Sequence, residues 1–263
     1  MLWVLGSMPR SDGRPLDALR PVEMVIGFHR PSEGSVLYRA GGTVVLCTAS
    51  IDDKVPPFLE GKNQGWLTAE YQMHPRANPK RQERDGRGKA PGGRTQEIQR
   101  LVGRALRGGV DLQRFGSRTI AIDCDVLEAD GGTRTAAVTG GFVALAVALA
   151  RIGASILREP LAAISVGYVE GIGPSDSSRA DAGWHALDLS YAEDSRARVD
   201  LNVVATASGK IIEVQGTAEG APVERSEVDA MVDLALMGIR RLVQLQRDAL
   251  ERAGVDLAAL TLR

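Results

Sequence analysis

The chain has 263 residues, 44% of them hydrophobic but only 4% aromatic, so it can bury a sizeable core that must be mainly aliphatic. The formal net charge is −1, which excludes a uniformly basic nucleic-acid binder and leaves room only for a local basic patch. No apolar run is long enough to span a bilayer, so we expect no membrane contact. Cys47 and Cys124 lie in strand-like apolar runs, which favours buried thiols and a cytoplasmic setting.

The first residues do not read as part of the domain. Met8 offers an alternative start, so residues 1–7 are interpreted as an N-terminal extension, either native or left over from expression. Residues 8–263 are interpreted as a single domain. Within it, residues 10–20 are polar and rich in turn formers, which indicates an irregular lead-in.

An antiparallel meander is predicted next. Alternating and β-branched residues indicate strands at 23–28, 34–39 and 43–50. Gly41 and the glycine after it suit the hairpin turn between the last two of these strands. A further short strand is expected at 66–71.

Residues 73–93 have the composition of a flexible basic loop. Three prolines interrupt this stretch, and it carries six basic residues against two acidic ones. One interpretation is a solvated linker, and the other is an arm that follows a polyphosphate chain. The basic residues are Arg76, Lys80, Arg81, Arg84, Arg87 and Lys89.

An amphipathic helix follows the loop. Ile98, Leu101, Val102, Ala105 and Leu106 recur at helical spacing and predict one apolar stripe, with arginines on the other side. At the start of this helix, directly after a glycine pair, stands Arg94. A cation is unfavourable near the positive end of a helix dipole, so this residue is either an ordinary surface arginine or one that serves a ligand.

The stretch from Arg118 to Arg151 is the centre of the chain. It reads as a strand, then a Gly131-Gly132 turn, then a mostly buried helix from Thr135. A Gly-Thr-Arg sequence at a helix start offers amide N–H groups, a hydroxyl and a guanidinium to one anion, which suits phosphate. The alternative is a tight strand–helix turn with an exposed arginine. The candidate phosphate ligands here are Gly132, Thr133 and Arg134.

The second half repeats the order of strands followed by a helix. The predicted strands cover 162–170, 184–189, 198–207 and 210–215, and a Gly/Ser/Asp-rich loop of unassigned role spans 171–183. A long apolar-faced helix runs from Ser226 to about Ala253. Two halves of strands followed by a helix indicate an α+β fold with internal duplication.

Asp188 and Asp194 form a second chemical signal. If the chain doubles back between them, both carboxylates face one point, and two hard oxygen ligands suit Mg²⁺. The alternative is an acidic surface turn. Further acids that remain open as ligands are Asp123, Asp125, Asp130 and Asp200.

Five segments together resemble the ribonuclease PH family, and they occur in that family's order. The resemblance that they carry extends over nearly the whole chain, from Met8 to about Leu250. They are residues 64–71 (QGWLTAEY), 93–100 (GRTQEIQR), 130–136 (DGGTRTA), 188–194 (DLSYAED) and 212–220 (IEVQGTAEG).

The resemblance implies a fold and an activity. The fold would be the ribonuclease PH domain, which is like domain 2 of ribosomal protein S5, in two related strand-plus-helix halves. The enzyme would be a phosphorolytic 3′→5′ exoribonuclease, or tRNA nucleotidyltransferase, which trims tRNA precursors beyond CCA. It would use inorganic phosphate, release nucleoside diphosphates reversibly, and assemble as a hexameric ring of dimers.

The resemblance also implies roles for particular residues, carried over by motif position. Phosphate would be held by Arg94, Gly132, Thr133 and Arg134. Asp188 and Asp194 would be the catalytic carboxylates and the Mg²⁺ ligands. RNA would be contacted by Arg76, Lys80, Arg81 and Arg84.

Two other functions compete with this one. A hydrolytic nuclease would release monophosphates and would need no phosphate. A catalytically silent RNA-binding ring subunit of an exosome-like assembly would not need both the arginines and the acidic pair. This chain has both, which favours the enzyme.

Overall fold

The computed structural model describes residues 10, 12–86, 88, 90–169, 183–219 and 221–262, and these form two sheets and five α-helices. The first sheet has the order β1 (Val22–Ile26), β2 (Gly34–Ala40), β3 (Thr43–Asp52), β5 (Thr119–Glu128), β4 (Trp66–Met73). The second has the order β7 (Trp184–Leu187), β6 (Leu161–Val169), β8 (Ala197–Thr206), β9 (Ile211–Ala218). The helices are α1 (Gly93–Gly108), α2 (Thr133–Ile152), α3 (Tyr191–Asp194), α4 (Arg225–Arg252) and α5 (Leu257–Leu260).

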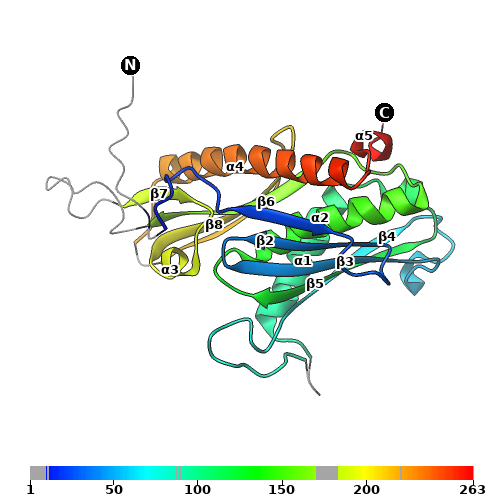
Figure 1. Ribbon diagram of the computed structural model, residues 1–263, viewed down its shortest axis with the longest axis horizontal. Helices are drawn as coiled ribbons and strands as arrows, with labels where there is room; N and C mark the ends of the chain where they lie inside the picture. The colour runs from blue at the N-terminus through cyan, green and yellow to red at the C-terminus, as the bar shows by residue number, and fades with distance from the viewer. Residues whose placement is uncertain are drawn as a thin grey trace, which may run out of the picture.

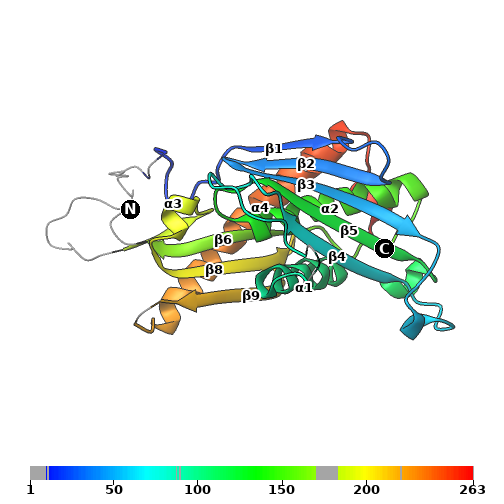
Figure 2. The same ribbon diagram turned by 90° about the horizontal axis from the view of Figure 1, so that it is seen from below.

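The two sheets confirm the predicted α+β fold in two strand-plus-helix halves. Figure 2 shows them side by side, with α1 running between β4 and β9. The predicted meander is present, because β1, β2 and β3 pair antiparallel in sequence order. The parallel pairing of β4 with β5 was not predicted, and it requires a crossover connection, which α1 supplies.

Helix α2 is the centre of the core. It packs on β2 and β3 of the first sheet and on β6 of the second, so almost every side of it is covered (Figure 1). A helix that is apolar all round must be buried. The prediction that no run reaches membrane-spanning length is wrong for α2 by length and hydropathy. However, 78% of the most apolar 18-residue stretch of α2 is buried inside the protein, so the helix belongs to the protein core.

The second sheet uses its two faces differently. Leu201, Val203 and Ala205 of β8 pack in one cluster with the apolar stripe of α4. Because side chains alternate along a strand, Asp200 and Asn202 lie on the opposite face of β8. The fold therefore directs a carboxylate away from the α4 core.

Several loops have more structure than the sequence indicates. The lead-in at 10–20 was expected to be irregular, yet it contributes two buried arginines, Arg10 and Arg20. Cys47 and Cys124 are buried free thiols, as predicted, and they face each other across β3 and β5. Residues 1–7, and 171–182 of the predicted loop, lie outside the described residues.

Gly34 lets β2 approach the backbone of α2. A Cβ atom at this position would overlap the carbonyl oxygen of Ala144 and lie 2.6 Å from the amide nitrogen of Ala148. Gly34→Ala should therefore lower the free energy of unfolding by about 3 kcal/mol, because helix backbone cannot move aside without repacking the core. Urea unfolding followed by circular dichroism measures this change.

The matched control is Gly93→Ala, at a position where a Cβ would meet nothing within 4 Å. It should leave stability unchanged or raise it by up to about 1 kcal/mol, since alanine is the better helix former. Equal unfolding midpoints for Gly34→Ala and the wild type would contradict the close β2–α2 packing.

Candidate active site

A glycine turn at the start of α2 is the first part of the site. Gly131 and Gly132 have φ values of +77° and +65°, a left-handed conformation that favours glycine. At Gly131 a Cβ would also lie 2.5 Å from the carbonyl oxygen of Leu189. The turn is thus pressed against the segment that leads into α3, and it opens a 20-residue helix whose first amides have no partner within the helix.

The side chain of Thr133 is held in place by a tyrosine of β4. The buried Tyr71 hydroxyl of β4 donates a hydrogen bond of 2.9 Å to Thr133 Oγ1. Burial raises the pKa of Tyr71, so the phenol stays protonated and remains a donor. Because the oxygen of Thr133 already accepts this bond, its own hydrogen is available to an anion.

Two arginines stand at the starts of two helices. Arg134 is the second residue of α2, and its Nη1 donates to Gln215 Oε1 at 2.8 Å and to Glu97 Oε1 at 3.4 Å. Arg94 is the second residue of α1, it is exposed, and it forms no ion pair with any described part of the chain. The sequence placed both residues correctly at helix starts.

Two carboxylates share the field of these arginines. Loss of hydration and the charge of Asp200 raise the pKa of Asp194, while the charges of Arg134 and Arg94 lower it. Burial likewise raises the pKa of Asp200, and the same two arginines lower it. Neither carboxylate has a hydrogen-bond or ion-pair partner among the described side chains. Two like charges without a fixed counter-ion suit a bound cation.

The donor set fits a lightly held divalent ion. Among the described residues there is no group of three or more histidine, cysteine, aspartate or glutamate side chains that could hold a metal. A pair of carboxylates is what Mg²⁺ commonly uses in proteins, because it keeps several waters and shares substrate phosphates. Asp194 and Asp200 therefore fit Mg²⁺ better than a closed structural metal site.

Asp188 is not placed as the sequence suggested. Its carboxylate is almost fully buried, and both oxygens accept bonds of 2.7 Å from Arg20, one from the backbone amide and one from Nη2. Its backbone has a positive φ of +55°. An oxygen pair already occupied by the amide and guanidinium of Arg20 is a poor metal ligand, which argues against the predicted role of Asp188 as the metal partner of Asp194. The carboxylate whose charge raises the pKa of Asp194 is that of Asp200, one of the acids that the sequence left open.

Arg20 links Asp188 to the glycine turn. Its Nη1 donates to the carbonyl oxygen of Asp130 at 2.5 Å, and its Nη2 reaches the carbonyl oxygen of Gly131 at 3.4 Å. In the same lead-in, Arg10 forms two bonds of 2.6 Å to Glu193 of α3, and both side chains are buried. The lead-in thus fixes both the phosphate-type turn and the helix that carries Asp194.

The predicted RNA-contacting residues all lie on one loop. Figure 1 shows the connection from β4 to α1 extending away from the two sheets. The end of this loop is fastened, because the Asp85 carboxylate accepts from the amide of Gly92 at 2.9 Å. Thr95 and the Gly92 amide lower the pKa of Asp85. The four basic residues are exposed, and they are Arg76, Lys80, Arg81 and Arg84.

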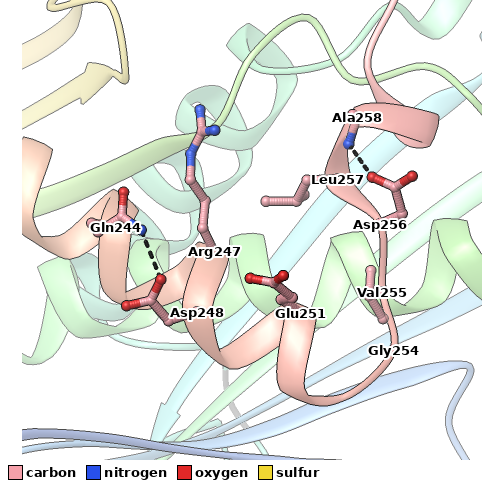
Figure 3. Close-up of a pocket in the computed structure, with 9 residues that line it drawn as sticks. All are labelled: Gln244, Arg247, Asp248, Glu251, Gly254, Val255, Asp256, Leu257 and Ala258. Atoms are coloured by element: carbon pink, nitrogen blue, oxygen red, sulfur yellow. Dashed lines mark hydrogen bonds between the residues drawn. The ribbon is translucent and has the colours of Figure 1, made fainter.

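A separate open hollow of about 550 Å³ lies between the end of α4 and α5 (Figure 3). Its lining includes Arg247, Glu251 and Asp248, and Gln244 donates to Asp248 at 2.7 Å. None of the predicted site residues lines it, so it is distinct from the junction described above.

The fold and the charged junction define a class: a two-half α+β protein with a glycine turn and an arginine at the start of its central helix. Comparison with known protein families identifies the family to which the chain belongs. The 3′ exoribonuclease family matches the chain twice, its domain 1 over residues 18–150 and its domain 2 over residues 159–238. The chain therefore belongs to the 3′ exoribonuclease family, which confirms the resemblance to ribonuclease PH.

Solved structures show the same fold. Rrp46 from rice (Oryza sativa) is similar with a TM-score of 0.72 and 18% sequence identity, over 92% of this chain and 100% of that one. A chain of the Archaeoglobus fulgidus exosome, with RNA bound to the active site, gives a TM-score of 0.73 and 20% identity, over 90% and 92%. At these identities the likeness establishes the fold alone.

The different surroundings of Asp188 and Asp200 predict opposite effects on stability. Asp188→Asn removes the charge that balances buried Arg20 and should lower the free energy of unfolding by about 3 kcal/mol. Asp200→Asn removes a repulsion and should raise the melting temperature of the metal-free protein at pH 7. Thermal unfolding in chelator compares the two variants.

The pH dependence of the Asp200→Asn effect follows from the sign of the pKa shift. The folded-state pKa values of Asp194 and Asp200 are raised, so the folded protein binds protons more strongly than the unfolded chain. Wild-type stability should therefore improve relative to the variant as the pH falls, and the difference should vanish below about pH 3.9, the ordinary aspartate value. A destabilised Asp200→Asn at pH 7 would contradict this account.

Proposed function

We propose that this protein is a phosphate-dependent 3′→5′ exoribonuclease that trims the 3′ ends of tRNA precursors. One observation carries the proposal: Arg94 and Arg134, at the starts of two helices, act electrostatically on the same carboxylates, Asp194 and Asp200. An anion site thus lies beside a cation site, as a phosphate nucleophile and a phosphodiester require. Membership of the 3′ exoribonuclease family supports RNA as the substrate.

The reaction balances without a strong base. A phosphate oxygen attacks the phosphorus of the last phosphodiester, a new P–O bond forms, and the bond to the 3′ oxygen of the preceding nucleotide breaks. The proton of the attacking hydrogen phosphate passes to the leaving 3′ oxygen. The products are therefore a nucleoside diphosphate and an RNA one nucleotide shorter with a 3′ hydroxyl. Because phosphate is already anionic near neutrality, the protein has to place it and offset its charge rather than deprotonate it.

Each group of the chain has one part in that task. Arg94 and Arg134 offset the repulsion between phosphate and the diester, and Thr133 donates its hydroxyl hydrogen to a phosphate oxygen. The amides of the Gly131-Gly132 turn orient the same anion. Asp194 and Asp200 would hold a divalent cation, which would stabilise charge on the transferring phosphoryl group. Asp188 acts indirectly, by fixing Arg20 under the turn.

The RNA is guided by the loop between β4 and α1. Its exposed basic residues Arg76, Lys80, Arg81 and Arg84 neutralise phosphates of the RNA backbone and read no sequence. The loop ends at Gly92, two residues before Arg94, so it leads directly to the phosphate site. We further propose that the protein is cytoplasmic and assembles as a homohexameric ring of dimers. The likeness to a chain of the Archaeoglobus fulgidus exosome supports a multi-subunit assembly.

Two alternatives remain distinct from this proposal. The fold alone is equally compatible with a catalytically silent ring subunit, but such a subunit has no need of two arginines whose charges act on two carboxylates without ion-pair partners. A hydrolytic nuclease uses water as its nucleophile, so it would not need Arg94 and Arg134 to bind inorganic phosphate.

Product analysis separates the three functions. A 3′-extended tRNA should be shortened only when both phosphate and Mg²⁺ are present, and the released nucleotides should be diphosphates. Chromatography of the nucleotides identifies them. Monophosphates released without phosphate would establish hydrolysis, and an intact tRNA under all conditions would establish the silent subunit.

Substitutions test the assigned residues. Arg134→Ala should lower phosphate-dependent kcat/KM by about 100- to 1,000-fold, the usual loss for one preorganised donor, with tRNA affinity within about twofold of wild type. Asp194→Asn should abolish turnover without unfolding the protein. The control is Arg104→Ala, an exposed α1 arginine that pairs with Glu213. Equal losses of tRNA binding and activity in Arg134→Ala would contradict its role at phosphate.

A further inference from the structure

The guanidinium of Arg134 is already held in place before any ligand binds. Glu97 of α1 and Gln215 of β9 contact it through one atom, Nη1, at 3.4 Å and 2.8 Å. The two holding side chains are also joined to each other, because Gln215 Nε2 donates to Glu97 Oε1 at 2.5 Å. Three elements thus meet in a closed ring of hydrogen bonds around one side of the arginine.

The other side of the guanidinium is left for a ligand. Within the described part of the chain, Nε and Nη2 of Arg134 form no hydrogen bond, and neither is a buried donor that lacks a partner. Nε and Nη2 form one edge of the planar fork, and two parallel bonds from one edge are the arrangement by which arginine binds phosphate. Holding the fork by Nη1 therefore preserves the edge that phosphate needs.

This arrangement also reduces the conformational entropy that the Arg134 side chain loses when it binds an anion. An unrestrained arginine gives up several rotatable bonds when it binds an anion, which weakens affinity. Here Glu97 and Gln215 impose the orientation beforehand. Glu97 is an acid, so it also competes with phosphate for the positive charge. Gln215 tempers this effect by donating a hydrogen bond to the same carboxylate oxygen.

We propose that Glu97 and Gln215 are positioning residues for the phosphate site, which fix the Arg134 guanidinium by Nη1 so that its Nε–Nη2 edge receives inorganic phosphate. The inference deepens the proposed function and rests on it. Neither residue touches phosphate, and neither was assigned a role by the sequence, although both lie in segments that carry the family resemblance.

A purely structural role is the competing explanation, because the same contacts tie α1, α2 and β9 together. The chain contains a matched control for it. Arg104 of α1 and Glu213 of β9 form a second tie between the same two elements, at 2.9 Å, and it does not involve Arg134. Loss of either tie should affect stability, but only loss of the first should affect phosphate.

The experiment measures phosphate in two independent ways. In the presence of Mg²⁺, Gln215→Leu should raise the KM for phosphate about tenfold with kcat within about twofold, because supporting contacts of this kind act on binding. The dissociation constant for inorganic phosphate, measured by calorimetry without RNA, should rise by the same factor. Glu213→Gln should leave both values at wild type.

The two variants of Glu97 separate hydrogen bonding from charge. Glu97→Gln keeps an acceptor oxygen and removes the competing charge, so its phosphate dissociation constant should equal or fall below that of the wild type. Glu97→Leu removes the acceptor and should weaken phosphate binding as Gln215→Leu does. If Gln215→Leu fails to fold, Glu97→Leu replaces it as the test of the positioning role.

The outcomes keep this inference apart from the proposed function. If the wild type binds phosphate but does not degrade RNA phosphorolytically, the proposed function fails and calorimetry alone decides the role of Glu97 and Gln215. Wild-type phosphate affinity in folded Gln215→Leu or Glu97→Leu would overturn the inference. Absence of phosphate binding by the wild-type protein would overturn both.

Discussion

The buried ion pair between Arg20 and Asp188 is the contact on which the site depends. It joins three segments that are distant in sequence: the lead-in before β1, the turn before α2 and the connection from β7 to α3. A buried charge without its partner is severely destabilising, so these segments are held in one arrangement. The carbonyl groups of Asp130 and Gly131 turn toward Arg20. In a trans peptide the N–H group points the opposite way, so the amides of Gly131 and Gly132 remain available to a different acceptor.

In contrast to this buried ion pair, the carboxylates of Asp194 and Asp200 destabilise the folded protein when no ligand is bound. Loss of hydration raises the pKa of both Asp194 and Asp200. No described side chain forms a hydrogen bond or an ion pair with either carboxylate. Such groups lower the stability of the empty protein and are retained where a ligand compensates for them. The same contrast separates Asp188, which is fully paired, from its neighbour six residues later. Asp188 stabilises the frame, whereas Asp194 holds the cation only under the proposed function.

Local patterns in the sequence predicted most of the elements and the positions of the glycine turn and of the arginines at the helix starts. Helix α1 follows from the spacing of Ile98 to Leu106, and the glycine turn with Arg134 follows from residues that adjoin in the chain. The choice between acids could not be made this way. Asp188 is satisfied by Arg20, which lies 168 positions earlier, and no local pattern reveals such a partner. Asp200 joins Asp194 only because β8 turns one face away from α4. The parallel β4–β5 pairing was missed for a similar reason, since it depends on where α1 returns the chain.

The central claim is that phosphate and a cation meet at one point, between the two helix starts and the carboxylate pair. Crystals grown with phosphate and Mn²⁺, the latter as an anomalous scatterer in place of Mg²⁺, test it most directly. The account predicts an anomalous peak between the carboxylates of Asp194 and Asp200, with a phosphate on the Nε–Nη2 edge of Arg134. A metal peak on Asp188, or a phosphate remote from Arg94 and Arg134, would contradict it.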